Sequence, residues 1–308
     1  MISIHHKTKQ FLVLLIKLLI VGCAFYFIYQ QLADNNKLDW DRLYTLLKKN
    51  HSFSVILLIL FLSFLNRFLE ILKWQNLVSY LHKISLPEAT KQVLGSLTLG
   101  IFTPNGLGEY AGKALFFEKV KIKKIIFLNV VCNGIQLILT ILFGTIGLLV
   151  LGYRFWVLGI LALSVFLILF SFLLKGIKIK GYSFEKFIRK INEIPKSIHQ
   201  KNIALGVFRY LVFSHQYYFL FLVFDVHLPY LTMMSTIATV YFLASSLPSF
   251  QFLDFAVKGS VSVFFFSVLG VNEWIVIFIS FLMWLLNVVV PVIIGSYYVI
   301  NFKVIKAT

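Results

Sequence analysis

Two short motifs place an acidic and a basic side chain four residues apart inside apolar sequence. Glu109 precedes Lys113 in Glu-Tyr-Ala-Gly-Lys, and Asp254 precedes Lys258 in Asp-Phe-Ala-Val-Lys. A spacing of four puts both side chains of a pair on one helical face, where their charges can neutralise each other. Ionisable groups at the centre of a bilayer cost ~2.5–3.5 kcal/mol each on insertion scales, so they are candidates for function. The alternative is structural: each pair only stabilises a strained break.

Each motif follows a break that contains proline. Residues 87–118 are apolar up to Phe102 and are then interrupted by Thr103-Pro104-Asn105-Gly106-Leu107-Gly108. Residues 228–270 are interrupted at Leu247-Pro248-Ser249. A half-helix after such a break directs free backbone N–H groups and its positive dipole end inward, where a lipid phosphate can bind. We expect both breaks to lie near the middle of the membrane.

The chemistry of these groups suits a lipid headgroup. Lys113 and Lys258 are expected to face one cavity and to contact a phosphate, while the carboxylates engage a cationic or sugar headgroup or relay protons. Arg67 shares a helical face with Glu70 and Lys73, although it can also be read as snorkelling to the interface. The candidate ligand-binding residues are Arg67, Thr103, Pro104, Asn105, Gly108, Glu109, Lys113, Pro248, Ser249, Asp254 and Lys258.

Composition indicates the environment of these motifs. The chain has 308 residues, of which 59% are hydrophobic and 13% charged, whereas soluble domains carry about 25% charged residues. This is the composition of a polytopic membrane protein. The net charge of +17 would suggest nucleic acid in a soluble protein, but here the basic residues lie between apolar runs, as the positive-inside rule requires of cytoplasmic loops. Cys23 and Cys132 lie in apolar segments, so no metal site, cofactor or nucleic-acid partner is expected.

Hydropathy divides the chain into eight hydrophobic segments. Six are long enough to span, namely 11–30, 52–80, 124–152, 155–174, 203–226 and 273–301. The first is expected to be a retained span, and residues 31–50 an amphipathic interfacial linker. Lys175 to Lys201 contains eight Lys or Arg and two Glu, so 175–202 is predicted to be a basic cytoplasmic loop. Behind Ser183 as a possible cap, this loop is expected to form a helix on the anionic membrane surface.

The matching breaks predict an internal duplication. With the N-terminus inside, each half reads as two spans, a hairpin and a span, in opposite orientation, as in many transporters. The predicted fold is a single all-α polytopic membrane domain over 1–308, with about six spanning helices and two re-entrant broken-helix hairpins in an inverted repeat. The first repeat covers 1–152, and the second covers 153–174 and 203–308. Chance similarity in Phe-rich sequence is the alternative explanation.

At these residues the chain resembles the lysylphosphatidylglycerol synthase transmembrane region family, also described as flippase-like. The resemblance rests on Asn66-Arg67-x6-Trp74, on Phe102-Thr-Pro-Asn-Gly-Leu-Gly-Glu109-x3-Lys113 and on the later Leu247-Pro248 break. It implies the translocating membrane half of multiple peptide resistance factors, which moves aminoacylated phospholipid between leaflets. It also implies a stand-alone membrane domain without the soluble aminoacyl-transferase domain, so we expect no enzyme activity.

The sequence therefore predicts a lipid translocase of the bacterial inner membrane with both termini in the cytoplasm. Its substrate is expected to be an amphiphilic, anionic, phosphate-bearing lipid, either a phospholipid or a polyprenyl-type lipid, and no oligomeric state is predicted. One alternative is the membrane component of a lipid aminoacyl- or glycosyl-transferase system that works with a separate soluble transferase. The other is a small-solute carrier or scaffold. A wide lateral opening between spans argues against this last reading, whereas a sealed polar cavity favours it.

Overall fold

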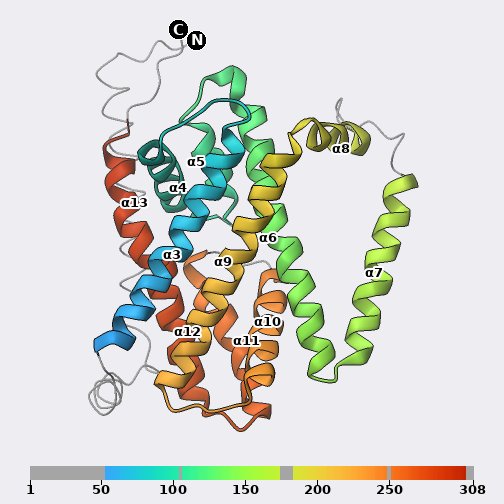
Figure 1. Cartoon of the computed structure of the whole chain (residues 1–308), viewed down its shortest axis with the longest axis vertical. Coiled ribbons are helices and arrows are strands. Elements are labelled where there is room, and N and C mark those ends of the chain that lie inside the picture. Colours follow the sequence, from blue (N-terminus) through green and yellow to red (C-terminus); the bar gives the residue numbers. More distant parts are fainter. Residues whose placement is uncertain (1–52, 104–105, 174–182, 248–250, 303–308) are drawn as a thin grey trace, which may run out of the picture.

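The computed structural model describes residues 53–103, 106–173, 183–247 and 251–302, and every regular element in these ranges is a helix (Figure 1). Four helical stretches in them are long and apolar enough to cross a membrane: Phe53–Val78, Lys119–Val150, Gln251–Val268 and Glu273–Ile300. The chain is therefore a multi-pass membrane protein. The expected first span at 11–30, the linker 31–50 and four of the candidate residues (Pro104, Asn105, Pro248 and Ser249) lie outside the described residues.

Two antiparallel helices run through the centre of the bundle. They are α3 (Phe53–Val78) and α9 (Lys196–Val223), which lie side by side in Figure 1. The Nδ2 of Asn76 donates to the carbonyl of Ile198 at 2.9 Å near one end of the pair. Near the other end, Gln216 donates to the carbonyl of Ile59 at 3.2 Å. The pair therefore keeps one register along its length.

α9 begins earlier than the sequence predicts. Residues 196–202 were assigned to the basic loop, whereas the structure includes them in a helix of 28 residues. Pro195 stands immediately before the helix, where its fixed φ and missing N–H cost nothing. At 1.5 Å per residue such a helix is ~42 Å long, so its basic first turns extend beyond a hydrocarbon core of ~30 Å.

Both broken segments form helical hairpins, as predicted. The first consists of α4 (Leu86–Gly100) and α5 (Leu107–Ala114), and the second of α10 (Tyr230–Ser246) and α11 (Asp254–Val268). In Figure 1 the first hairpin occupies the upper half of the bundle and the second the lower half. By length and composition alone α11, with the short turn η3 before it (Gln251–Leu253), could cross a membrane, although the sequence predicts that it returns to the side it came from.

Three further helices complete this part of the fold. α6 (Ile122–Val150), entered through a 3₁₀ turn at Lys119–Lys121, packs on α9 and α10 and is followed by α7 (Arg154–Leu173). The predicted basic helix is present as α8 (Phe184–Glu193), and the Oγ of Ser183 caps it by accepting from the backbone N–H of Lys186 at 3.2 Å. The ring of Phe187 packs edge-on against that of Phe127 at 5.5 Å, so α8 is docked on the start of α6.

The last predicted span is interrupted in its middle. The structure divides 273–301 into α12 (Glu273–Trp284), a π-helical turn at Leu285–Val289 labelled η4, and α13 (Val290–Ile300). Pro291 explains the interruption, because it has no N–H to donate to the carbonyl four residues earlier and its ring crowds that carbonyl. The freed carbonyl belongs to Asn287, and π turns of this kind recur at functional sites.

Small residues allow two close helix crossings. A Cβ on Gly147 of α6 would lie 2.5 Å from the carbonyl oxygen of Ser235 in α10. On α13, a Cβ on Gly295 would overlap the carbonyl oxygen of Leu94 in α4. Without a hydrophobic driving force between helices in lipid, such close packing is a main source of association. The second hairpin is therefore held against α6 through α10, and the first against α13 through α4.

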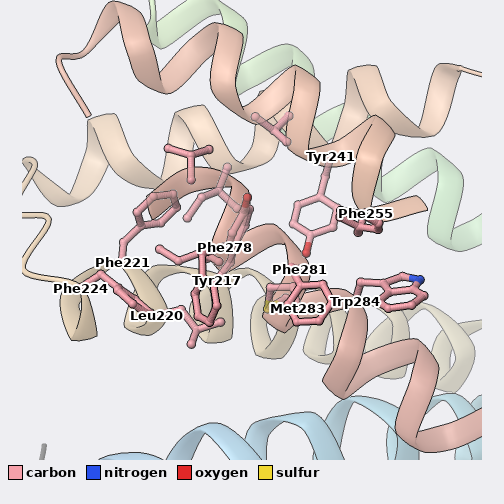
Figure 2. Packing of buried hydrophobic residues seen from close by; sticks show 14 of the residues in the cluster. Tyr217, Leu220, Phe221, Phe224, Tyr241, Phe255, Phe278, Phe281, Met283 and Trp284 are labelled. Atoms are coloured by element: carbon pink, nitrogen blue, oxygen red, sulfur yellow. The ribbon is translucent and has the colours of Figure 1, made fainter. Parts of the chain in front are cut away.

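Aromatic side chains fill the core around the second hairpin. In Figure 2 the buried rings of α9, α10, α11 and α12 pack on one another. The rings of Phe221 and Phe266 lie 4.3 Å apart, and Phe255 contacts Trp284 at 5.5 Å between centroids. This packing holds the start of α11, which carries Asp254, close to the middle of the molecule.

Candidate functional site

A cavity of about 600 Å³ lies where the two hairpins and the central helices meet. Its wall includes residues of α3, α5, α6, α9, α10, α11, α12 and the π turn. The charged side chains that line it are Arg67, Glu70, Glu109, Arg209, Asp254 and Lys258. The cavity therefore collects charges from both halves of the chain.

The first predicted pair forms as expected, but its lysine lies behind the cavity wall. The Nζ of Lys113 donates to Glu109 Oε1 at 2.8 Å and to Asn129 Oδ1 at 2.9 Å. It also lies 4.8 Å from the ring centroid of Trp74, and the side chain is fully buried. Glu109 lines the cavity and Lys113 does not. Lys113 thus supports the carboxylate from behind, and the expectation that it faces the cavity is wrong.

The second predicted pair lines the cavity with both members. The Nζ of Lys258 lies 2.6 Å from Asp254 Oδ2 and 5.2 Å from the ring centroid of Tyr241. The side chains of Lys258 and Asp254 are 30% and 24% exposed, compared with 0% and 13% for Lys113 and Glu109. The two pairs thus share their spacing and differ in how far they are open to the cavity.

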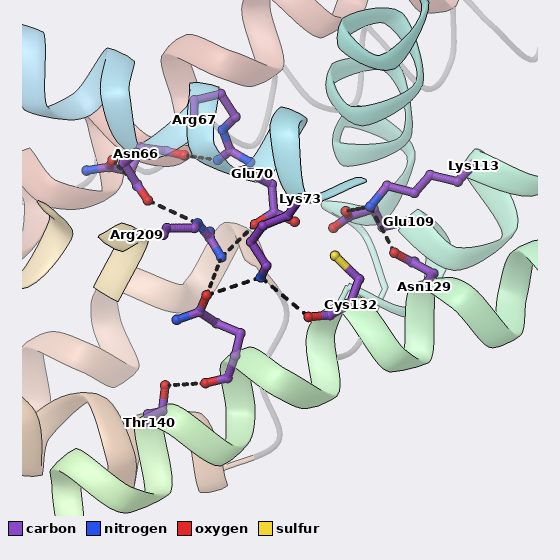
Figure 3. A network of polar contacts seen from close by, with 12 residues as sticks. Asn66, Arg67, Glu70, Lys73, Glu109, Lys113, Asn129, Cys132, Thr140 and Arg209 are labelled. Carbon is purple, nitrogen blue, oxygen red and sulfur yellow. Dashed lines mark hydrogen bonds and ion pairs between the residues drawn. The ribbon is translucent and has the colours of Figure 1, made fainter. Parts of the chain in front are cut away.

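The strongest contacts between the central helices involve a residue that was not predicted, Arg209 of α9 (Figure 3). Its Nη1 lies 2.6 Å from Glu70 Oε2 on α3. Its Nε donates to Asn66 Oδ1 at 3.1 Å, and Nη1 also lies 3.4 Å from Gln136 Oε1 on α6. Because guanidinium donors have a fixed fork geometry, these contacts hold α3, α6 and α9 at one point.

Asn287 connects this network to the interrupted last span. Its carbonyl, to which Pro291 cannot donate, accepts from Arg67 Nη2 at 2.5 Å. Its side chain accepts from Asn66 Nδ2 at 2.7 Å and donates to Gln216 Oε1 at 3.0 Å. The break in the last span is therefore hydrogen-bonded to both α3 and α9.

Lys73 extends the network toward the end of the bundle where α6 begins. This side chain is fully buried, and Figure 3 shows it pointing toward α6. Its Nζ donates to Gln136 Oε1 at 3.2 Å and to the carbonyl of Cys132 at 3.4 Å. A charged amine is costly to bury unless it is paired, and both of these acceptors are neutral.

The tips of the two hairpins touch each other. Gly106 caps α5 in the left-handed region at φ 68°, where a side chain would be strained. A Cβ there would lie 2.5 Å from the Nε2 of Gln251 at the start of the second hairpin's return. Thr103 stabilises the turn between α4 and α5, because its Oγ1 donates to the carbonyl of Gly100 and accepts from the N–H of Gly108 at 2.6 Å. Thr103 and Gly108 thus shape the turn.

The structure therefore divides the predicted site residues into groups. Arg67, Glu109, Asp254 and Lys258 line the cavity. Lys113, Thr103 and Gly108 support it from outside the wall. Within the described ranges, no group of three or more His, Cys, Asp or Glu side chains is arranged to hold a metal ion.

Sequence reasoning missed Arg209 and Asn287, which bring the halves together. The sequence nevertheless contains a feature that could have identified each residue. Arg209 is an isolated charge inside the apolar segment 203–226, and intramembrane charges mark function by default. Asn287 stands four residues before Pro291 in an apolar run, so its carbonyl loses its α-helical donor.

These features define a multi-pass membrane protein that encloses a charged cavity between two broken helices. The sequence profile described as lysylphosphatidylglycerol synthase TM region matches residues 14–295. The chain belongs to this family, as its motifs predict. A search of curated protein sequences gives no match.

Proposed function

We propose that this protein is a lipid translocase of the bacterial inner membrane and has no enzymatic activity of its own. The headgroup of an amphiphilic, anionic, phosphate-bearing lipid enters the cavity, and its acyl chains stay in the bilayer. The single observation that carries this proposal is that the cavity combines a charged inner wall with an exposed apolar rim. Membership of a family associated with lipid metabolism supports it.

The rim supports a lateral opening toward lipid. Val130 and Leu137 of α6 and Leu247 at the end of α10 line the cavity, yet they are 39%, 49% and 47% exposed. Gly134 lies between the first two on the same face of α6, and a Cβ on it would meet no atom within 4 Å. Apolar side chains that are exposed at this depth face acyl chains. Such an opening favours a lipid over the small solute that a sealed cavity would accommodate.

The arrangement of the two hairpins supports the inverted repeat. α6 packs on α10 through Gly147, and α13 packs on α4 through Gly295. Each hairpin therefore meets the corresponding helix of the other half, and the hairpins occupy opposite ends of the bundle (Figure 1). We infer that both hairpins are re-entrant and that α3, α6, α7, α9 and the α12–α13 pair span the membrane, together with the predicted span at 11–30. Discontinuous helices that meet near the midplane are typical of substrate sites in transporters.

Cysteine labelling tests this topology. In a background without the two native cysteines, a cysteine at Lys123 should react with an impermeant maleimide only from the cytoplasmic side. A cysteine at the exposed Glu273 should react only from outside, because the inverted repeat puts the two hairpins on opposite sides. Mass-tagging of spheroplasts and inverted vesicles measures both. Labelling of both positions from the same side would disprove the inverted repeat.

Blocking the lateral opening tests the function. In proteoliposomes with tail-labelled anionic phospholipid, dithionite bleaching should show faster translocation than in protein-free vesicles. Gly134→Trp should lower the protein-dependent rate at least tenfold, because its Cβ starts in open space at the rim and the indole is large enough to obstruct the opening. Gly159→Trp on α7 is the matched control, since that glycine also has no atom within 4 Å of its Cβ position. Wild-type vesicles that bleach no faster than protein-free ones would contradict the proposal.

A further inference from the structure

The buried polar system carries more positive than negative charge. Among the described residues, the charged side chains that line the cavity or contact a side chain that lines it are five bases, Arg67, Lys73, Lys113, Arg209 and Lys258, and three acids, Glu70, Glu109 and Asp254. Three ion pairs, Lys113–Glu109, Arg209–Glu70 and Lys258–Asp254, use all three acids. Arg67 and Lys73 are left with neutral acceptors only. Within the described part of the chain, the surplus is therefore two positive charges.

Two hydrogen-bond donors of the same wall, on α3 and α6, also lack an acceptor. Among the described residues, the Nε of Arg67 and the Nε2 of Gln136 are buried and have no acceptor. The orientation of the Gln136 amide is determined by its neighbours, because its oxygen accepts from the cations Lys73 and Arg209. The nitrogen therefore stays unpaired. An unpaired buried donor costs ~1–3 kcal/mol, so both donors indicate a missing acceptor.

These donors and charges converge on one part of the cavity wall. Arg67, Gln136 and Arg209 come from α3, α6 and α9, and all three line the cavity. Arg209 lies 3.4 Å from the oxygen of Gln136 and 3.1 Å from that of Asn66, the neighbour of Arg67 in sequence. Lys73 lies directly behind Gln136, at 3.2 Å. The anion position is therefore between the central helices, and the lysines of the two hairpin motifs are already paired elsewhere.

From this balance we propose that the cavity binds a doubly charged phosphate, the phosphomonoester or diphosphate headgroup of a lipid, at Arg67, Gln136 and Arg209. This rests on the proposed function and narrows its substrate class. A net charge in a low-dielectric interior is costly unless an opposite charge balances it. A phosphomonoester carries about −1.5 to −2 at pH 7, which matches the surplus of two, whereas a phosphodiester carries one negative charge and leaves one positive charge unbalanced.

Binding of matched lipids to the purified full-length protein in a non-ionic detergent tests the proposal. The probes are phosphatidic acid, phosphatidylmethanol with the same acyl chains, and inorganic phosphate. Phosphatidic acid, the monoester, should bind at least tenfold more tightly than phosphatidylmethanol, the diester. Inorganic phosphate should bind more weakly than phosphatidic acid, because it lacks the acyl chains. Equal affinity for the two lipids would overturn the proposal, and phosphate that binds as tightly as phosphatidic acid would show that the ligand is free phosphate.

Variants assign the preference to the surplus charge. Arg67→Gln removes one positive charge and should reduce the preference for the monoester to threefold or less, whereas Arg67→Lys should retain most of it. Lys73→Met removes the same charge from behind the wall, and it should have the same effect even if Arg67→Gln fails to fold. Arg154→Gln is the control, since Arg154 is exposed at the start of α7, and it should leave the preference unchanged.

A preference that persists in both Arg67→Gln and Lys73→Met would overturn the charge argument. Failure of the dianion-site proposal can be distinguished from failure of the translocase proposal. Vesicles in which wild-type protein translocates phosphodiester and phosphomonoester lipids equally well would refute the dianion site alone. Vesicles in which neither lipid moves faster than in protein-free controls would refute the translocase.

Discussion

The Glu109→Gln, Lys113→Met double variant is expected to fold but to translocate lipid at less than a tenth of the wild-type rate. Replacing a buried ion pair jointly by neutral groups is often nearly neutral for stability. Transport should nevertheless fall, because Glu109 lines the cavity and its carboxylate is lost. The rate is measured by dithionite bleaching in proteoliposomes, and folding by thermal melting in detergent.

Single variants and a matched surface pair complete this test. Lys113→Met alone leaves the half-buried Glu109 without its ion-pair partner, and it should lower the melting temperature more than the double variant does. The control is Glu118→Gln with Lys121→Met, a pair three residues apart whose side chains are 65% and 39% exposed. It should leave both transport and melting unchanged. Full transport by the Glu109→Gln, Lys113→Met variant would remove both residues from the site.

Adding a methyl group at the close helix crossings should destabilise the bundle. Gly147→Ala and Gly295→Ala each place a Cβ against a backbone carbonyl of the facing hairpin helix, which cannot move without shifting that helix. Overpacking of this kind typically costs ~1–3 kcal/mol, so the melting temperature should fall. Gly134→Ala on α6 is the control, because its Cβ would meet nothing within 4 Å. If all three variants melted like the wild type, the crossings would be looser than the structure indicates.

Local sequence patterns predicted the helices well. The two broken segments, the cap at Ser183 and both acid–lysine pairs depend on residues only a few positions apart. Pro and Gly mark the breaks, and a spacing of four makes the pairs geometrically possible on any helix. These features follow from backbone geometry alone, and the structure confirms them.

The contacts that assemble the cavity could not be predicted in the same way. Arg209 and Asn66 are 143 positions apart, and Asn66 and Asn287 are 221 apart. The choice of partner depends on which helices become neighbours, and apolar sequence on every side carries little information about this. The position of Lys113 shows the same limit. Its spacing from Glu109 was predicted, but its burial against Trp74 and Asn129 depends on how α5 packs on α4 and α6.

The ion pair between α3 and α9 has a consequence for the biosynthesis of the protein. α3 carries Arg67, Glu70 and Lys73, whereas Arg209 is synthesised more than a hundred residues later. At ~5–20 residues per second, α3 waits roughly 7–30 s for its partner. During that interval Glu70 lacks its Arg209 partner, and an ionised side chain costs ~2.5–3.5 kcal/mol in lipid. We therefore expect the nascent α3 to stay beside the translocon or an insertion chaperone until α9 emerges, so this one contact links the order of membrane insertion to the fold.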